Sequence, residues 1–480
     1  MRPRTEKEAN TVDTRPNILW VCTEHHRFDT IHALGNPHIR TPNLDQLTRE
    51  GVAFTHAFAQ NSVCTPSRAS FLTGRYPAAT RCRQNGQNIP EDEVLITRVL
   101  RDLGYDCGLA GKLHVSASAT GSERRVDDGY RMFAWSHGST AKHGGEWMRW
   151  LGSRGKSFED VYHRSSVLLS RQVTGREYHQ TTWCFQRALE FMREKRSGPW
   201  LVSVNPFAAH DPFDFLREYY ERYDPKTLPP PRFRPGELEN KPPSQTAYFK
   251  TLGFERTGDL QRREMKAAYY ATIEHIDAEF GRLLAWLDES GQREHTLILF
   301  TADHGEMLGD HGIFTKGPFL YDPAVRVPLV FSWPGRVRAG RRYDGLVELV
   351  DIVPTLYELL GLEIPNRVQG RSLAPILTGE TPPAVHKEGV YAEYYNSNPA
   401  ATLPNRSKVY ATMWRDKRYK IVVYHGEEYG ELYDLEKDPD EFENRWEDPS
   451  YRDARFGLLK RCFDARVFTM DPLPERVENF

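Results

Sequence analysis

The sequence lacks the features that mark a membrane protein or a nucleic-acid binder. No apolar run approaches the roughly 20 residues that a membrane-spanning helix needs. The 64 basic and 66 acidic residues nearly cancel, so no excess charge attracts nucleic acid or a membrane surface. Residues 1–16 are polar and charged and carry no apolar segment of a secretory signal. We therefore expect a disordered N-terminal segment and a cytoplasmic location, the alternative being a chain that has already been processed.

Cysteine is scarce and scattered. The six cysteines show no Cys-x-x-Cys spacing, which argues against a zinc cluster and against a disulfide-dense scaffold. Most of them are expected to be small, buried apolar side chains. Cys64 differs, because an arginine and a helix-like pattern follow it closely.

Apolar segments of strand length alternate with helical patterns along most of the chain. This alternation predicts an α/β fold in which helices flank a doubly wound, mostly parallel sheet. The expected buried strands are 17–23, 105–110, 200–205, 296–301 and 327–331, and the expected helices are 41–51, 94–104, 176–195 and 263–290, the last as one helix or two.

The chain divides into a main part and a smaller C-terminal part. Residues 17–375 are expected to form the catalytic α/β domain, interrupted by a Pro-rich surface insertion at about 211–260. Residues 376–480 contain short strands and turns and are expected to form a smaller α+β subdomain with a tail. The tail, residues 468–480, is apolar and aromatic, so we predict that it makes oligomer contacts; the alternative is packing on its own subunit or a frayed end.

A cysteine and an arginine lie at the start of one predicted helix. Pro66 suits the first turn of this helix and Gly74 suits its end. Cys64 then lies at the helix N-terminus, which favours anions, and Arg68 projects from the same face four residues later. This arrangement predicts a site for a tetrahedral oxyanion. The alternative is a core cysteine near a surface arginine.

Polar side chains follow two predicted strands directly. Asp303 and His304 come after the strongest strand, and Glu24 and His25 come after the first. Open α/β sheets bind ligands at the carboxyl ends of their strands, so these four residues are candidate ligands of a hard divalent ion. The alternatives are a turn for the first pair and a helix cap for the second. The second Asp-His pair, at 310–311, follows no strand and is interpreted as structural.

Two further histidines follow strands. His114 comes after 105–110, and His210 comes after 200–205. Histidine can transfer protons near neutral pH, although a single histidine is more often structural. Lys316 taken singly is a surface lysine.

Together these segments resemble the sulfatase family of the alkaline phosphatase superfamily. The segment Cys64-Thr-Pro-Ser-Arg68 with Leu72-Thr-Gly-Arg75 matches that family's signature, Cys-x-Pro-Ser-Arg followed by Leu-Thr-Gly-Arg. The resemblance covers roughly residues 16–445 in family order. Its other matches are 42–45, 111–114, Asn205-Pro206 with His210, 302–305, Lys316, 418–421 and 431–439.

The resemblance implies an arylsulfatase-like hydrolase of a small sulfate monoester. A formylglycine-generating enzyme would oxidise Cys64, and one hydroxyl of the resulting aldehyde hydrate would attack sulfur beside one divalent metal. Calcium is implied by the resemblance, with manganese or magnesium as alternatives. By the same resemblance, Arg68 holds the hydrate, Lys112 and Lys316 bind sulfate oxygens, His114 assists deprotonation, and His210 is the general acid.

The metal site departs from the family at two positions. The family usually has Asp-Asp or Asp-Gln after the first strand, whereas this chain has Glu24 and His25. A nitrogen in place of an oxygen moves the expected preference toward manganese or another transition ion, and either residue or both could be ligands. A phosphonate monoester or phosphodiester hydrolase therefore stays open as an alternative function, with an inactive binding protein as a minor one.

Overall fold

The computed structural model describes residues 15–474 except 119–120, 141, 252–253, 380–381 and 398–407. Of the N-terminal segment that was expected to be disordered, residues 1–14 lie outside the described residues, as do residues 475–480 of the tail. The centre of the structure is a nine-stranded sheet with the order β11-β2-β10-β9-β1-β7-β3-β4, in which β12 also pairs with β2. None of the described helices combines the length and apolar character that crossing a membrane requires.

The central strands are buried on both faces. In β1 (Asn17–Thr23), Ile18 and Trp20 join a core cluster on one side of the sheet, and Leu19 and Val21 join a cluster on the other. This alternation follows from the two-residue period of a strand, and it explains why the strand reads as one continuous apolar run. The predicted doubly wound α/β fold is confirmed.

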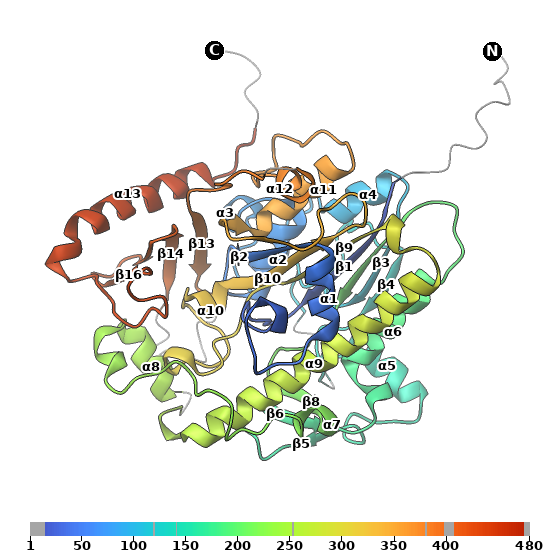
Figure 1. Cartoon of the computed structure of the whole chain (residues 1–480), viewed down its shortest axis with the longest axis horizontal. Coiled ribbons are helices and arrows are strands. Elements are labelled where there is room, and N and C mark those ends of the chain that lie inside the picture. The colour runs from blue at the N-terminus through green and yellow to red at the C-terminus, as the bar shows by residue number, and fades with distance from the viewer. Residues whose placement is uncertain are drawn as a thin grey trace, which may run out of the picture.

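Helices cover the two faces of the sheet, as Figure 1 shows. One core cluster joins the sheet to α2, α4, α11 and α12, and the other joins it to α1, α6 and α9. The helices are α1 (Pro42–Glu50), α2 (Cys64–Thr73), α3 (Pro77–Thr80), α4 (Ile96–Asp102), α5 (Gly145–Ser153), α6 (Gln180–Met192), α7 (Arg217–Tyr220), α8 (Pro243–Thr251), α9 (Asp259–Glu289), α10 (Asp322–Val325), α11 (Ile352–Leu359), α12 (Ala374–Thr378) and α13 (Arg452–Phe468).

Most neighbouring strands of the central sheet run parallel. The row β9-β1-β7-β3-β4 is parallel throughout, whereas β10 is antiparallel to both β9 and β2. Because two reversals cancel, β2 points the same way as β9. The strands of this sheet after β1 are β2 (Val52–Phe58), β3 (Asp106–Gly111), β4 (Met132–Trp135), β7 (Trp200–Asn205), β9 (Thr296–Ala302), β10 (Arg326–Ser332), β11 (Arg341–Tyr343) and β12 (Val347–Glu348).

Two smaller sheets flank the centre. The C-terminal sheet is antiparallel in the order β13-β14-β15-β16 and carries α13 on one face, at the left of Figure 1. This confirms the expected smaller α+β part. A three-stranded sheet of β5, β6 and β8 lies near α9. Their strands are β5 (Tyr162–Arg164), β6 (Ser170–Val173), β8 (Phe213–Leu216), β13 (Val390–Tyr395), β14 (Tyr410–Arg415), β15 (Tyr419–Tyr424) and β16 (Gly430–Asp434).

Several element boundaries differ from the sequence prediction. The region expected as one helix or two is the single 31-residue helix α9. Helix α6 begins at Gln180 rather than 176, because a short 3₁₀ turn precedes it and the His179 side chain accepts the Thr181 N–H as a cap. Helix α2 begins at Cys64, two residues before Pro66.

We predict that Gly74→Ala destabilises the fold more than Gly361→Ala. Gly74 ends α2 with a φ of 71°, and a Cβ there would lie 2.9 Å from both Val353 and Val368 side chains. Gly361 has a φ of 69° with nothing within 4 Å of a Cβ. Both variants strain the backbone by about 1 kcal/mol, and crowding adds about 1–3 kcal/mol at Gly74. Equal unfolding midpoints in a denaturant titration would contradict this.

Candidate active site

The carboxyl ends of the parallel strands form one edge of the sheet, and polar residues gather there. Glu24 and His25 follow β1, Lys112 follows β3, Asn205 ends β7, and Asp303 follows β9. Because β9, β1, β7 and β3 are direct neighbours, these ends lie side by side. The edge is thus the place where this fold class binds ligands.

Helix α2 brings Cys64 to the same edge. The loop after β2 leads into α2, and β2 points the same way as β9, so α2 begins where the parallel strands end. Cys64 is the first residue of α2, and its side chain is 1 % exposed. The free N–H groups at a helix start favour negative charge near the sulfur.

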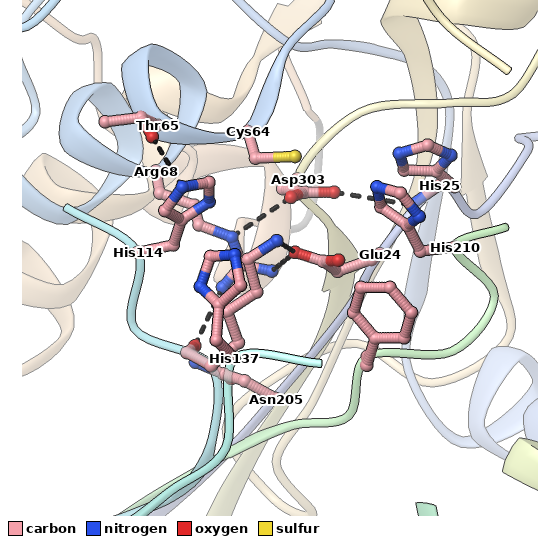
Figure 2. Close-up of polar contacts among 12 residues, drawn as sticks. Glu24, His25, Cys64, Thr65, Arg68, His114, His137, Asn205, His210 and Asp303 are labelled. Carbon is pink, nitrogen blue, oxygen red and sulfur yellow. Dashed lines mark hydrogen bonds and ion pairs between the residues drawn. The ribbon is translucent and has the colours of Figure 1, made fainter. Parts of the chain in front are cut away.

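Arg68 joins two strand ends by ion pairs. Its Nε lies 3.0 Å from Asp303 Oδ2, and its Nη2 lies 3.1 Å from Glu24 Oε1. Lys112 Nζ contacts the same Glu24 oxygen at 2.5 Å. Figure 2 shows Arg68 with Asp303 and Glu24 below Cys64. All four side chains are at most 2 % exposed, so each charge depends on the others for compensation.

Lys316 lies at the sulfur of Cys64. Its Nζ is 3.2 Å from Cys64 Sγ, 2.5 Å from His25 Nε2 and 2.9 Å from His210 Nε2. On the other side, His304 Nε2 is also 3.2 Å from the sulfur. Although burial opposes it, the neighbouring Cys64 and Glu24 raise the pKa of Lys316, so this side chain carries its positive charge.

Burial keeps three histidines of the site, His25, His114 and His304, neutral. It lowers the pKa of His304 to about 4 and the pKa values of His25 and His114 well below 6.5. The nearby Lys112 and Lys316 act in the same direction on His114 and His25. Neutral imidazoles keep a lone pair, so these rings can accept a proton or bind a metal.

Two groups of side chains that could hold a metal ion meet at Cys64. The ligand atoms of His25, Cys64 and His304 lie within 4.8 Å of one another, and so do those of Glu24, Cys64 and His114. Glu24 Oε2 is buried and has no hydrogen-bond partner among the described residues. Burial raises the pKa of Glu24 against the effect of Lys112, so a bound cation would stabilise the charged form of this carboxylate.

The structure brings the ten predicted residues into one connected cluster. His114 Nε2 contacts Thr65 Oγ1 at 3.0 Å beside Cys64, and the His210 ring stacks against His25 with centroids 3.9 Å apart. By contrast, Asp310 pairs with Arg27 and His311 pairs with Glu237, away from Cys64, in agreement with their structural interpretation. The cluster comprises Glu24, His25, Cys64, Arg68, Lys112, His114, His210, Asp303, His304 and Lys316.

Three residues of the site escaped the sequence analysis as individual candidates. Glu306 Oε2 lies 2.8 Å from His25 Nδ1, and Asp211 Oδ1 lies 3.2 Å from His210 Nδ1. His137 packs edge-on against His114, with centroids 4.4 Å apart (Figure 2). Glu306 and Asp211 directly adjoin the predicted motifs 302–305 and 205–210, and this adjacency was the signal available in the sequence.

The doubly wound sheet and the polar cluster at its edge fit a hydrolase of the alkaline phosphatase superfamily. Residues 16–362 match the family model described as Sulfatase, and residues 309–467 match N-sulphoglucosamine sulphohydrolase, C-terminal. The chain belongs to the sulfatase family, and it is an enzyme of sulfatase type. This confirms the resemblance on which the sequence analysis relied.

Relatives and solved structures cover nearly the whole chain. The multifunctional alkaline phosphatase superfamily protein PehA of Trinickia caryophylli is 30 % identical over 91 % of this chain and 92 % of its own. An arylsulfatase of Clostridium perfringens is 29 % identical over 93 % of both. The phosphonate monoester hydrolase of Agrobacterium radiobacter is 26 % identical with a TM-score of 0.80, covering 95 % of this chain and 97 % of that one.

We predict that Arg68→Leu lowers the free energy of unfolding of the metal-free protein by about 3–5 kcal/mol, because it leaves two carboxylates buried without their shared partner. Arg68→Lys keeps the charge and should lose less. As a control, Arg81→Leu breaks a pair with Asp92 that is more than half exposed, and should cost less than about 1 kcal/mol. Denaturant titration with chelator present measures all three; equal losses for Arg68→Leu and Arg81→Leu would refute the expectation.

Proposed function

We propose that this enzyme hydrolyses a small sulfate monoester at Cys64. The observation that carries the proposal is the environment of the sulfur, which lies at the start of α2 and 3.2 Å from both Lys316 Nζ and His304 Nε2. A tetrahedral anion at this place would meet the helix N-terminus and two lysine ammonium groups. The family assignment supports the same substrate class.

The proposed chemistry needs two groups that the sequence does not encode. Formylglycine at position 64 would supply the attacking hydroxyl, and one divalent metal would act as a Lewis acid and as a template. We propose that a formylglycine-generating enzyme modifies Cys64, and that Glu24, His25, Asp303 and His304 hold the metal. The unpartnered Glu24 Oε2 and the neutral imidazoles support this ligand set.

The cations of the site would bind and orient the sulfate group. Half-buried Lys316 contacts the Cys64 sulfur, and buried Lys112 contacts Glu24 beside it, so both ammonium groups would stabilise charge on the non-bridging oxygens as the bond to the alcohol breaks. Arg68 is held by Glu24 and Asp303 and would fix the positions of both carboxylates relative to the side chain of residue 64.

Two histidines would move protons. His210 Nε2 accepts a hydrogen bond from Lys316 Nζ at 2.9 Å, which would place this ring beside the leaving oxygen; in its protonated form it would donate a proton to that oxygen. Asp211 contacts His210 Nδ1, and although burial opposes it, His210 lowers the pKa of Asp211 to about 2. The Asp211 carboxylate therefore stays charged and would orient the acid. His114, on the other side of Cys64, would take a proton from position 64.

We propose that residues 17–375 form the catalytic domain with an insertion at about 211–260, and that residues 376–480 form a C-terminal subdomain and tail. The antiparallel sheet of β13 to β16 with α13 supports this division. A cytoplasmic location stays a prediction from the sequence alone.

A second candidate function is the hydrolysis of phosphonate monoesters or phosphodiesters. Phosphonate monoester hydrolases from Agrobacterium radiobacter and Silicibacter pomeroyi have TM-scores of 0.80 and 0.81 to this chain, with 26 % and 27 % identity. The same nucleophile and cations would serve either anion, so substrate turnover separates the two candidates.

We expect the enzyme, once produced together with a formylglycine-generating enzyme, to turn over an aryl sulfate with a higher kcat/KM than an aryl phosphonate monoester. The Cys64 peptide should then be lighter by about 18 Da, the change from –CH₂SH to –CHO. Cys64→Ala should lower kcat/KM by a factor on the order of 10⁴ or more, because the nucleophile is lost.

Cys82→Ala is the matched control, because Cys82 is a buried free cysteine outside the cluster and should leave turnover unchanged. A preference for the phosphonate ester would move the assignment to the second candidate. Absence of turnover of both esters by protein with the verified mass change would contradict both candidates.

We also propose that the enzyme forms a homo-oligomer through α13 and the tail. Phe456 is 77 % exposed, Phe463 is 70 % exposed and Phe468 is 80 % exposed, and the first two lie seven residues apart on one face of α13. Val467, Met470 and Leu473 extend this apolar surface toward the tail. A second copy of the same helix is its proposed partner.

Deleting residues 468–480, or replacing both Phe456 and Phe463 with serine, should reduce the mass in solution measured by light scattering. Replacement of Leu260, which is 49 % exposed on α9, is the control and should not change the mass. An oligomer of unchanged mass in both test variants would rule out this interface.

A further inference from the structure

We propose that His25 binds the metal through Nε2, that Glu306 holds its ring in place, and that the site consequently selects a first-row transition dication such as Mn²⁺ over Ca²⁺. This inference rests on the proposed function, because it concerns the metal of that site. It starts from a contact that the sequence analysis did not foresee, the hydrogen bond between His25 and Glu306.

The hydrogen bonds of His25 fix which ring nitrogen carries the proton. Lys316 Nζ lies 2.5 Å from Nε2, and an ammonium group can only donate, so Nε2 accepts. In a neutral imidazole the proton then lies on Nδ1, which donates to Glu306 Oε2 at 2.8 Å. His25 and Glu306 are both fully buried, so no solvent competes for this bond. The lone pair of His25 is therefore on Nε2.

This lone pair points toward Cys64. Besides His25 Nε2, Lys316 Nζ contacts Cys64 Sγ at 3.2 Å and His210 Nε2 at 2.9 Å, so three acceptors already converge on one cationic group. The His25 and His304 rings are tilted by 51° to each other, with centroids 4.6 Å apart. His25 and His304 would each supply a nitrogen to a bound divalent cation, and Glu24 and Asp303 would each supply a carboxylate.

The main chain holds His25 in this orientation. Its φ of 49° is unusual for a non-glycine residue, and its carbonyl accepts the Tyr269 hydroxyl at 2.6 Å. Its own N–H donates to Asp303 Oδ1 at 3.4 Å. A carboxylate on the far nitrogen of a ligating histidine is the usual means by which proteins orient such a ligand and raise its basicity.

The adjacent histidine shows that this arrangement is specific to position 25. His26 is equally buried, but its Nδ1 contacts Thr23 Oγ1 at 3.0 Å and its ring packs edge-on against Phe300. His26 thus serves the core on the other side of the strand end. The two neighbours form a natural pair of test and control residues.

A set of two carboxylates and two imidazoles suits a transition ion better than calcium. Calcium takes six to eight oxygen ligands, whereas first-row transition dications, in an affinity order that begins at Mn²⁺, bind sites that also contain imidazole nitrogen. Replacing His25 with glutamine would exchange the nitrogen for an oxygen at the same position. The calcium preference implied by the family resemblance therefore gives way, for this chain, to a preference set by His25.

The test measures metal binding to the full-length, metal-free protein. Calorimetric titrations with Mn²⁺ and with Ca²⁺ give the selectivity, and pulsed EPR of the Mn²⁺-loaded protein counts imidazole nitrogens on the ion. We expect wild type to bind Mn²⁺ at least 100-fold more tightly than Ca²⁺ and to show two nitrogen couplings, one each from His25 and His304.

His25→Gln should lower the ratio of Mn²⁺ affinity to Ca²⁺ affinity at least tenfold and remove one nitrogen coupling. Glu306→Gln should keep both couplings but weaken Mn²⁺ binding about 10–100-fold, as loss of such a supporting carboxylate does. His26→Gln should match wild type in both measurements. Circular dichroism checks that each variant is folded. If His25→Gln does not fold, the test rests on the number of nitrogen couplings in wild type and on the Mn²⁺ affinity of Glu306→Gln.

A single nitrogen coupling in wild type, two couplings in His25→Gln, or an unchanged affinity in Glu306→Gln would overturn the inference. These measurements need no substrate. A protein that binds Mn²⁺ through His25 but cleaves neither ester would overturn the proposed function and leave this inference intact. An active enzyme with a single nitrogen coupling would support the proposed function and overturn this inference.

Discussion

The buried ion pairs of Arg68 are the interaction on which the rest of the site depends. One guanidinium lies between the carboxylates that follow β1 and β9, and it projects from the helix that begins with Cys64. Isolated charges at such depth would cost several kcal/mol each. The compensation is possible only while α2 lies across the strand ends, so the charges that make the site reactive also determine where α2 packs.

The same burial determines the chemistry of the nitrogen groups. Buried imidazoles lose their protons, whereas Lys316 keeps its charge because Cys64, Glu24 and other acids surround it. The result is a fixed positive charge and several lone pairs around one sulfur atom. Water would weaken each of these interactions, and the eight cluster residues other than His210 and Lys316 are buried from it.

The sequence predicted the strand ends well because the central strands are buried on both faces. Runs such as 17–23 and 296–301 contain no charged residue, and their ends are marked by Glu24 and Asp303. The sequence did not identify β14 and β16 as strands. The strand β16 contains buried Glu431 and Asp434, whose partners include Tyr321 and Arg418 from other elements, so its sequence resembles a surface turn.

The three missed site residues likewise depend on contacts with other side chains. Glu306, Asp211 and His137 act through partners that the fold supplies, and neither spacing nor residue type identifies those partners beforehand. Glu306 reaches His25 from 281 positions along the chain, across the parallel pair β1 and β9. Tertiary contacts of this kind determine the ring orientation and tautomer of His25, which is why the sequence left open whether Glu24, His25 or both are ligands.

The charge of the substrate explains why one fold serves sulfatases and phosphonate monoester hydrolases alike. A sulfate monoester and a phosphonate monoester are both tetrahedral and both carry one negative charge, so the proposed sites at Lys112, Lys316 and the start of α2 would attract both. Discrimination must then come from groups that contact the fourth substituent. His137 lies beside His114 at the edge of the cluster, on a loop that also carries His143. If the proposed function holds, the uncharged groups around the site, such as His137, would decide which ester is cleaved, and its cations would not.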